Sequence, residues 1–363
     1  MLRLSWLVTA LSALSLASPL AEVEAIRGIS PLPRLVLYFQ TTHDARGRPI
    51  SMLPLVNEKG IALTHLIVCS LHVNEKGEIH LNNYPPSHAI FHTLWNETRV
   101  MKRAGVKVMG MVGGAAPGSF TKGTLDGNQA TFAKYYGQLR DAIARSQLQG
   151  LDIDVEQYMS QGGIKRLIDQ LRKDFGRDFI ISLAPVAAAL RGGGNLSGFD
   201  YKRLDARSGS KISFYNGQFY SGFGTMASTG DYESIVSHGF AASRVVAGQL
   251  TSPKNGGGYM PYSKLNATIM SLRRKYGQIG GVFGWEYFNS QPDDKARPWK
   301  WAQIMTQILR PNSVPRLTIN RSMADQLTAA YRGSKAPVAD VQAAKYAQNL
   351  DTPDVDYYAM VNA

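Results

Sequence analysis

The chain has 363 residues, a formal net charge of +13 and a single cysteine, Cys69. Its length allows one large domain with a tail or two modest domains, and the lone cysteine excludes an internal disulfide, so stability has to come from a large apolar core. The basic residues are scattered, and no aromatic–basic nucleic-acid motif accompanies them, so we expect no nucleic-acid partner.

The first residues are typical of a secretory signal. Met1-Leu2-Arg3 gives a basic start, residues 4–16 are apolar, and small residues at 17–18 offer a cleavage site. The apolar run is shorter than the roughly 20 residues that a membrane-spanning helix needs. We therefore expect a signal peptide over 1–18, a short segment over 19–31, and a secreted, extracellular protein without a membrane anchor.

Four Asn-x-Ser/Thr sequons follow in the rest of the chain. In a secreted protein they predict N-glycosylation. The expected acceptors are Asn96, Asn195, Asn266 and Asn320.

Short apolar, β-branched runs recur eight times, with stretches of helical periodicity between most of them. They span residues 35–40, 64–70, 107–113, 150–156, 179–184, 212–220, 244–250 and 280–285. This alternation favours an α/β fold, a (β/α)8 TIM barrel. The last two runs lie only about 30 residues apart, so we expect no inserted domain between strands 7 and 8.

The barrel is expected to occupy residues 32–311. Residues 312–363 then form a C-terminal tail. Within it, Ser322 is the expected cap of a short helix that runs through Tyr331.

The run 150–156 carries the chemistry. Because side chains alternate along a strand, Asp152, Asp154 and Glu156 share one face, and the aliphatic residues between them share the other. The run is short and bounded by Gly150, as in a buried parallel strand, where charge is costly. In a barrel of this kind the working residues lie at the C-terminal strand ends, which places Glu156 at the mouth.

Packed carboxylates cannot all ionise cheaply, so at least one pKa should rise, as a general acid requires. Two other interpretations remain. The acids could bind a hard metal, for which His43, Asp44 and Glu286 are scattered further ligands, or they could form a purely structural network. We favour acid catalysis without a metal or cofactor.

Residues 149–156 resemble the DGxDxDxE signature of glycoside hydrolase family 18. Residues 111–114 resemble its SxGG element, 216–220 its sixth-strand element, and 284–286 the end of its eighth strand, so the resemblance covers 32–311. Gln149 stands where the signature has Asp, and Met111 where it has Ser. Segments 38–44 and 110–120 look most like secreted fungal endo-β-N-acetylglucosaminidases of this family.

The resemblance implies a retaining, substrate-assisted mechanism, in which the substrate's own N-acetyl oxygen attacks the anomeric carbon and gives an oxazolinium ion. Glu156 would protonate the glycosidic oxygen and later activate water, Asp154 would orient the acetamide and stabilise the developing positive charge, and Tyr220 would hold the acetamide from the other side. From its depth on the strand, we expect Asp152 to share a proton with Asp154. The substrate-binding residues implied are Trp285, Gln218, Tyr38 and Gly114.

The expected substrate is the N,N'-diacetylchitobiose core of high-mannose N-glycans on glycoproteins. The missing insertion and the few tryptophans favour a soluble glycan over chitin. An open-cleft endochitinase acting on chitin oligosaccharides and a non-catalytic glycan-binding protein of the same fold are the alternatives. We expect a monomer.

Overall fold

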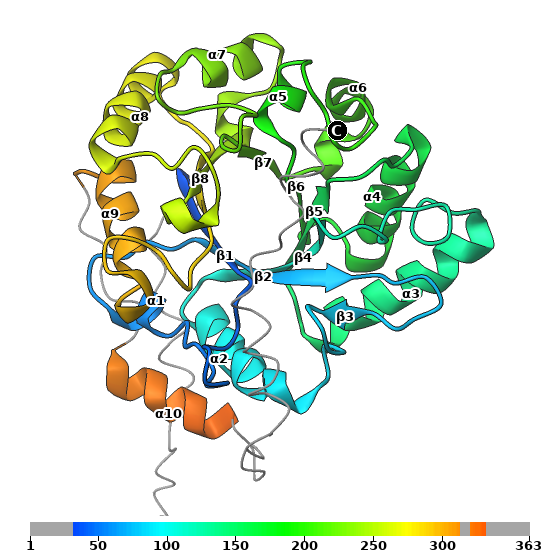
Figure 1. The fold of residues 1–363 in the computed structure, drawn as a ribbon, viewed down its shortest axis with the longest axis horizontal. Helices are drawn as coiled ribbons and strands as arrows, with labels where there is room; N and C mark the ends of the chain where they lie inside the picture. The colour runs from blue at the N-terminus through cyan, green and yellow to red at the C-terminus, as the bar shows by residue number, and fades with distance from the viewer. Residues whose placement is uncertain (1–31, 313–319, 332–363) are drawn as a thin grey trace, which may run out of the picture.

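The computed structural model describes residues 32–312 and 320–331. The expected signal peptide, the segment 19–31 and the part of the tail after Tyr331 lie outside the described residues. Within them, eight parallel strands close into a barrel because β1 pairs with β2 on one side and with β9 on the other, and helices surround the strands (Figure 1). The predicted (β/α)8 barrel is confirmed.

The barrel strands agree with the predicted runs to within a few residues at each end. They are β1 (Arg34–Phe39), β2 (His65–His72), β4 (Lys107–Gly114), β5 (Gly150–Val155), β6 (Ile180–Leu183), β7 (Phe214–Gln218), β8 (Val245–Leu250) and β9 (Gly281–Trp285). One further strand was not predicted: β3 (His80–Leu81) pairs antiparallel with the end of β2. Two residues are too few to show the alternation that identifies a strand in a sequence.

Helices alternate with the barrel strands. They are α1 (Pro54–Asn57), α2 (His92–Arg103), α3 (Gln129–Arg145), α4 (Gln161–Phe175), α5 (Ala187–Leu190), α6 (Tyr201–Ser208), α7 (Gly230–Ser237), α8 (Tyr262–Tyr276) and α9 (Lys300–Leu309). Side-chain caps explain where α3 and α4 begin. The side chain of Asn128 accepts the backbone N–H of Thr131 at the start of α3, and that of Ser160 accepts the N–H of Gly163 at the start of α4.

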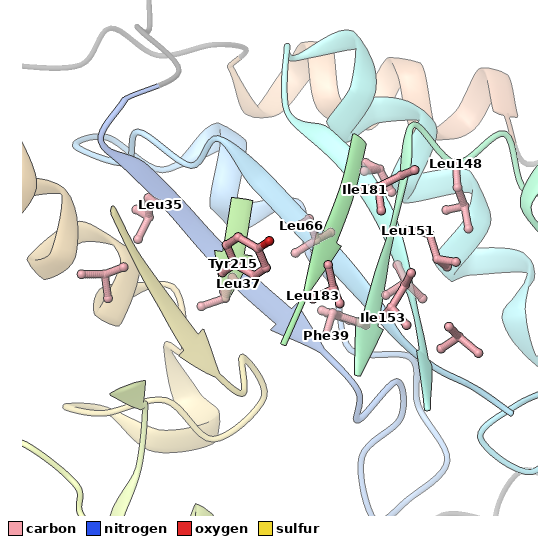
Figure 2. Packing of buried hydrophobic residues seen from close by; sticks show 14 of the residues in the cluster. Leu35, Leu37, Phe39, Leu66, Leu148, Leu151, Ile153, Ile181, Leu183 and Tyr215 are labelled. Atoms are coloured by element: carbon pink, nitrogen blue, oxygen red, sulfur yellow. The ribbon is translucent and has the colours of Figure 1, made fainter. Parts of the chain in front are cut away.

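The strands bury both of their faces. Outward side chains such as Leu37, Leu66 and Ile153 pack against the helices in a large apolar layer (Figure 2). Inward side chains form a smaller second cluster inside the barrel. Its members are Val36, Tyr38, Ile67, Cys69, Met109, Met111, Phe214, Tyr220, Val246, Leu250 and Phe283. The inward-facing acidic residues of β5 lie on top of this inner cluster.

The segment between β8 and β9 contains α8 and a short 3-10 turn, and no strand. The predicted absence of an inserted domain there is confirmed. Among the described residues, no helix combines the length and the apolar character that crossing a bilayer requires.

A last helix, α10 (Arg321–Tyr331), follows the barrel and contacts α2 on its outer side (Figure 1). The helix was predicted, but its cap was not. Asn320 Oδ1, and not Ser322, accepts the backbone N–H of Met323 at 2.8 Å. Two capping residues lie two positions apart here, and sequence alone does not choose between them.

Candidate active site

The alternation along β5 has the predicted consequence in three dimensions. Leu151, Ile153 and Val155 are buried in the outer apolar layer. On the inward face Asp152 is 0% exposed and Asp154 5%, whereas Glu156, directly after the strand, is half-buried. The three acids therefore rise from the barrel interior to its mouth, and Glu156 is the one that solvent reaches most easily.

Asp152 is held by donors from three other strands. Tyr38 Oη of β1 donates to its Oδ2 at 2.6 Å, Ser182 Oγ of β6 donates to its Oδ1 at 2.6 Å, and Asn216 Nδ2 of β7 donates to the same Oδ1 at 3.1 Å. The Asn216 amide also donates to Tyr38 Oη at 3.0 Å. These bonds fix the carboxyl of Asp152 in one orientation beneath the other two acids.

Gln218 connects the upper two acids. Its Nε2 amide donates to Glu156 Oε1 at 3.0 Å and lies 3.3 Å from Asp154 Oδ1, and it also donates to the carbonyl oxygen of Ala184 at 3.0 Å. An amide nitrogen has only two hydrogens for these three acceptors, so the longest contact, the one to Asp154 Oδ1, is the weakest. The amide therefore sets the orientation of both carboxyls at once.

Burial raises the pKa of all three acids. For Asp154 the pKa lies well above its usual range, first because of burial and then because Glu156 and Asp152 are like charges close by. Burial also raises the pKa of Glu156, and the hydrogen bond from Gln218 opposes that rise. A carboxylic acid that keeps its proton at the mouth of a barrel can serve as a general acid.

The end of β4 leaves room for Asp154. A Cβ at Gly113 would lie 2.1 Å from the Asp154 carbonyl oxygen, and one at Gly114 would lie 3.9 Å from Asp154 Oδ2. Both glycines have left-handed backbone, with φ of 100° and 95°. Met111 pairs in register with Asp152 and is fully buried in the inner cluster. Gly114 is thus part of the wall beside the Asp154 carboxyl.

Aromatic side chains cover the opposite side of the barrel. The half-buried Trp285 meets Tyr38 edge-on, with ring centroids 5.4 Å apart, and Tyr220 meets Phe283 edge-on at 6.2 Å. Tyr220 is 8% exposed, whereas Tyr38 is 2% exposed and directs its hydroxyl at Asp152. Trp285 is therefore the most accessible of these rings at the strand ends.

Sequence reasoning missed Ser182 and named Asn216 only as part of a segment. Both are fully buried polar residues that bond Asp152. A signal exists for each: Ser182 interrupts an aliphatic strand, and Asn216 shares a strand face with Gln218. Gln149, where the family signature has Asp, accepts the backbone N–H of Val108 through Oε1 at 3.0 Å and so supports the strand.

The scattered candidates for a metal site do not come together with the acids. Glu286 accepts the backbone N–H groups of Gln40 and Thr41 and the Thr41 hydroxyl, and His43 bonds Thr42. Asp44 bonds Arg48. Within residues 32–312 and 320–331, no group of three or more His, Cys, Asp and Glu side chains is arranged to hold a metal ion.

The predicted glycosylation sites lie on the outside of the fold. Asn195 is exposed in the loop before α6, and Asn320 is exposed at the start of α10. Asn96 on α2 and Asn266 on α8 are half-buried. Occupancy stays a prediction at each.

The comparison with solved structures gives close matches. A fungal endo-β-N-acetylglucosaminidase from glycosyl hydrolase family 18 is 65% identical, with a TM-score of 0.77, covering 78% of this chain and 100% of that one. The chitinase ChiC from Aspergillus fumigatus is 51% identical, with a TM-score of 0.69, covering 75% and 98%. A family 18 chitinase from Pseudoalteromonas aurantia shares the fold at 21% identity and a TM-score of 0.61, covering 76% and 100%. No protein-family model and no curated protein matches the chain.

Proposed function

Because the chain belongs to glycoside hydrolase family 18, we propose that it is an endo-β-N-acetylglucosaminidase that hydrolyses the β-1,4 bond within the diacetylchitobiose core of high-mannose N-glycans. The observation that carries the proposal is the acid pair at the mouth: Glu156 and Asp154, joined by Gln218. The 65% identity to a fungal endo-β-N-acetylglucosaminidase supports the choice of bond.

In this mechanism Glu156 protonates the glycosidic oxygen. The acetamido oxygen of the sugar at the barrel centre attacks its own anomeric carbon from the opposite face and expels the leaving sugar, which gives an oxazolinium ion. Glu156, now ionised, takes a proton from water, and that water opens the ion with net retention of configuration. The raised pKa of Glu156 supports the first step, because the acid has to keep its proton until substrate arrives.

Asp154 and Tyr220 hold the acetamide on two sides. The Asp154 carboxyl lies beside Glu156 and can accept the acetamide N–H as positive charge develops, which is where a fixed acceptor lowers the barrier. Asp152, bonded by Tyr38, Ser182 and Asn216, keeps Asp154 in place from below. We assign Tyr38 and Gln218 to positioning the acids, and Trp285 to the floor under the sugar.

The test uses one denatured high-mannose glycoprotein and mass spectrometry of its products. A single N-acetylglucosamine left on asparagine is the expected result, and an unchanged mass would overturn the proposal. Glu156→Gln should bind the glycan but turn over at least ~100-fold more slowly, since it keeps the shape of the side chain and loses the acid. Unaltered turnover would remove Glu156 from the mechanism.

An open-cleft endochitinase is the second candidate, favoured by the 51% identity to a fungal chitinase. It predicts short oligosaccharides from colloidal chitin at a rate comparable with glycoprotein cleavage. The two functions are separated by measuring both substrates with the same preparation.

We also propose that the protein is secreted as a monomer, cut after its signal peptide and glycosylated at one or more of its four sequons. The basic-apolar-small pattern of residues 1–18 supports this. N-terminal sequencing, the mass before and after chemical deglycosylation, and size-exclusion chromatography of the protein collected from culture medium would test each part.

A further inference from the structure

Tyr158 is the most exposed large apolar side chain in the described part of the chain. It is 66% exposed, and Met270 on α8 follows at 44%. Tyr158 lies only two residues beyond Glu156, in the loop that leaves β5 at the barrel mouth. An aromatic ring left open to water next to a catalytic acid is a natural contact for a ligand.

The ring of Tyr158 is held in place from below. The position that a Cβ would take at Gly198 is only 2.4 Å from Tyr158 Cδ2 and 2.9 Å from Cε2, so the ring rests directly on this glycine. Any larger residue at 198 would displace it. One side of the ring is therefore seated on the loop before α6, and the remainder faces solvent.

The residues on both sides of Tyr158 are fixed as well. The N–H of the fully buried Met159 donates to the Ser197 carbonyl oxygen at 2.9 Å, and Ser197 Oγ donates to the Val155 carbonyl oxygen at 2.7 Å. Gln157 Oε1 accepts the backbone N–H of Gly118 from the loop after β4 at 2.8 Å. The loop that carries Tyr158 is thus hydrogen-bonded to both neighbouring loops. A ligand that binds there would therefore not pay the entropy cost of ordering this loop.

The location of Tyr158 identifies which half of the substrate it meets. In the proposed reaction Asp154, Tyr220 and Trp285 surround the sugar at the barrel centre, and Glu156 lies under the bond that breaks. The leaving sugar then lies beyond Glu156, away from the barrel axis. Two residues of chain reach at most about 7 Å, which keeps Tyr158 within one sugar of the acid.

We propose that Tyr158 binds the leaving half of the substrate, the asparagine-linked N-acetylglucosamine, by packing its ring against the apolar C–H face of that sugar. The tyrosine ring suits the role because it is rigid, flat and apolar in the middle and carries a hydroxyl at its edge. The inference rests on the proposed function and names a binding subsite of the same cleft.

The experiment compares two substrates that differ only in the leaving half. A high-mannose glycopeptide carries the asparagine-linked sugar, whereas the matching glycan oxazoline has no leaving group and enters the reaction after that sugar has gone. For Tyr158→Ala we expect kcat/KM on the glycopeptide to fall about tenfold, equivalent to ~1.4 kcal/mol, mainly through KM. Oxazoline hydrolysis should stay within about twofold of the unaltered protein, because the lost contact is not part of that step.

Three further variants sharpen the result. Tyr158→Phe should keep most of the activity, since it keeps the ring. Gly198→Ala should reproduce the selective loss, since its methyl group displaces the ring without removing it, and should also lower the melting temperature, since Gly198 has a left-handed φ of 76° that alanine disfavours. Met270→Ala removes an exposed apolar side chain of the outer helix α8 and should change the cleavage of neither substrate. Equal melting temperatures would show that the Tyr158 variants fold.

Each result has a clear reading. If Tyr158→Ala leaves glycopeptide cleavage unchanged, or lowers both substrates equally, Tyr158 does not bind the leaving sugar and the inference fails while the function stands. If the unaltered protein turns over neither substrate, the proposed function itself fails.

Discussion

At the scale of single residues, the site holds two buried carboxyls and a half-buried third where a typical core would hold apolar side chains. Burial and ionisation conflict most strongly at Asp154, because burial and two neighbouring acids raise its pKa together. The folded protein then binds a proton that the unfolded chain has already released, so stability falls as the pH rises from the usual value near 3.9 through the raised pKa. Catalysis and stability therefore make opposite demands at this position.

We predict that Asp154→Asn stabilises the protein while it lowers activity. The neutral amide needs no proton uptake on folding, so the melting temperature should exceed that of the unaltered protein at pH 7 by about 2 °C for each kcal/mol gained. The gap should shrink on acidification and vanish below about pH 3.9, where both side chains are neutral. Calorimetric scans across this range measure it, and a gap independent of pH would contradict the prediction.

The hydrogen bond from Gln218 to Glu156 gives a second prediction. That bond favours the ionised acid, so Gln218→Met should raise the pKa of Glu156 further and move the alkaline limb of kcat/KM to higher pH. Asp154→Asn should move the same limb to lower pH, because removing a like charge makes ionisation of the coupled pair easier. The pH profile of glycopeptide cleavage measures both.

The matched control for the Gln218→Met and Asp154→Asn variants is Gln249→Met on β8. Gln249 is equally buried, but its amide donates to the Gly248 carbonyl and to no acid. It should leave the pH profile in place. If all three variants shift the limb in one direction, the cause is general loosening of the barrel.

At the scale of elements, the acids of β5 could be predicted from the sequence because alternation along one strand is a local property. Their partners could not. Ser182 and Asn216 reach Asp152 only through the register of neighbouring strands, in which Asp152 pairs with Met111 on one side and Ser182 on the other. Barrel closure fixes that register, and no single strand encodes it. For the same reason the role of Tyr38 beneath Asp152 emerged only from the structure.

The contact between α10 and α2 gives the third prediction. Ala324 on α10 is fully buried, whereas Ala329 on the same helix is exposed. Ala324→Asp places an unpaired charge in the contact between α10 and α2 and should cost about 2 kcal/mol of stability. The loss cannot exceed the free energy that docking of α10 contributes. Activity should persist, because α10 lies outside the barrel on the α2 side (Figure 1).

Hydrogen–deuterium exchange of residues 321–331 reports this undocking directly. The matched control, Ala329→Asp, makes the same chemical change on the solvent side and should leave both exchange and melting temperature nearly unaltered. Equal effects from the two substitutions would indicate lost helix propensity and would argue against a docked helix.

At the scale of the whole molecule, closure of the barrel couples the strands. β1 pairs with β2 and β9, so each strand of the barrel is hydrogen-bonded to a neighbour on both sides. Detaching any strand therefore breaks two sets of backbone hydrogen bonds. Cys69, in β2, faces the inner cluster and is 0% exposed. Burial raises the pKa of its thiol well above the usual range, and the nearby charges of Glu286 and Asp152 add to the rise.

We therefore predict that Cys69 labelling reports global unfolding. The reactive species is the thiolate, which the folded barrel both hides and disfavours, so a disulfide-exchange reagent should not modify the native protein over hours. In denaturant the labelling rate should follow the rate of global unfolding, with the same dependence on denaturant concentration as the fluorescence signal. Cys69→Ala provides the blank. Rapid labelling under native conditions would mean that β2 opens by itself, and the closed ring would then not be the cooperative unit that holds the acids in place.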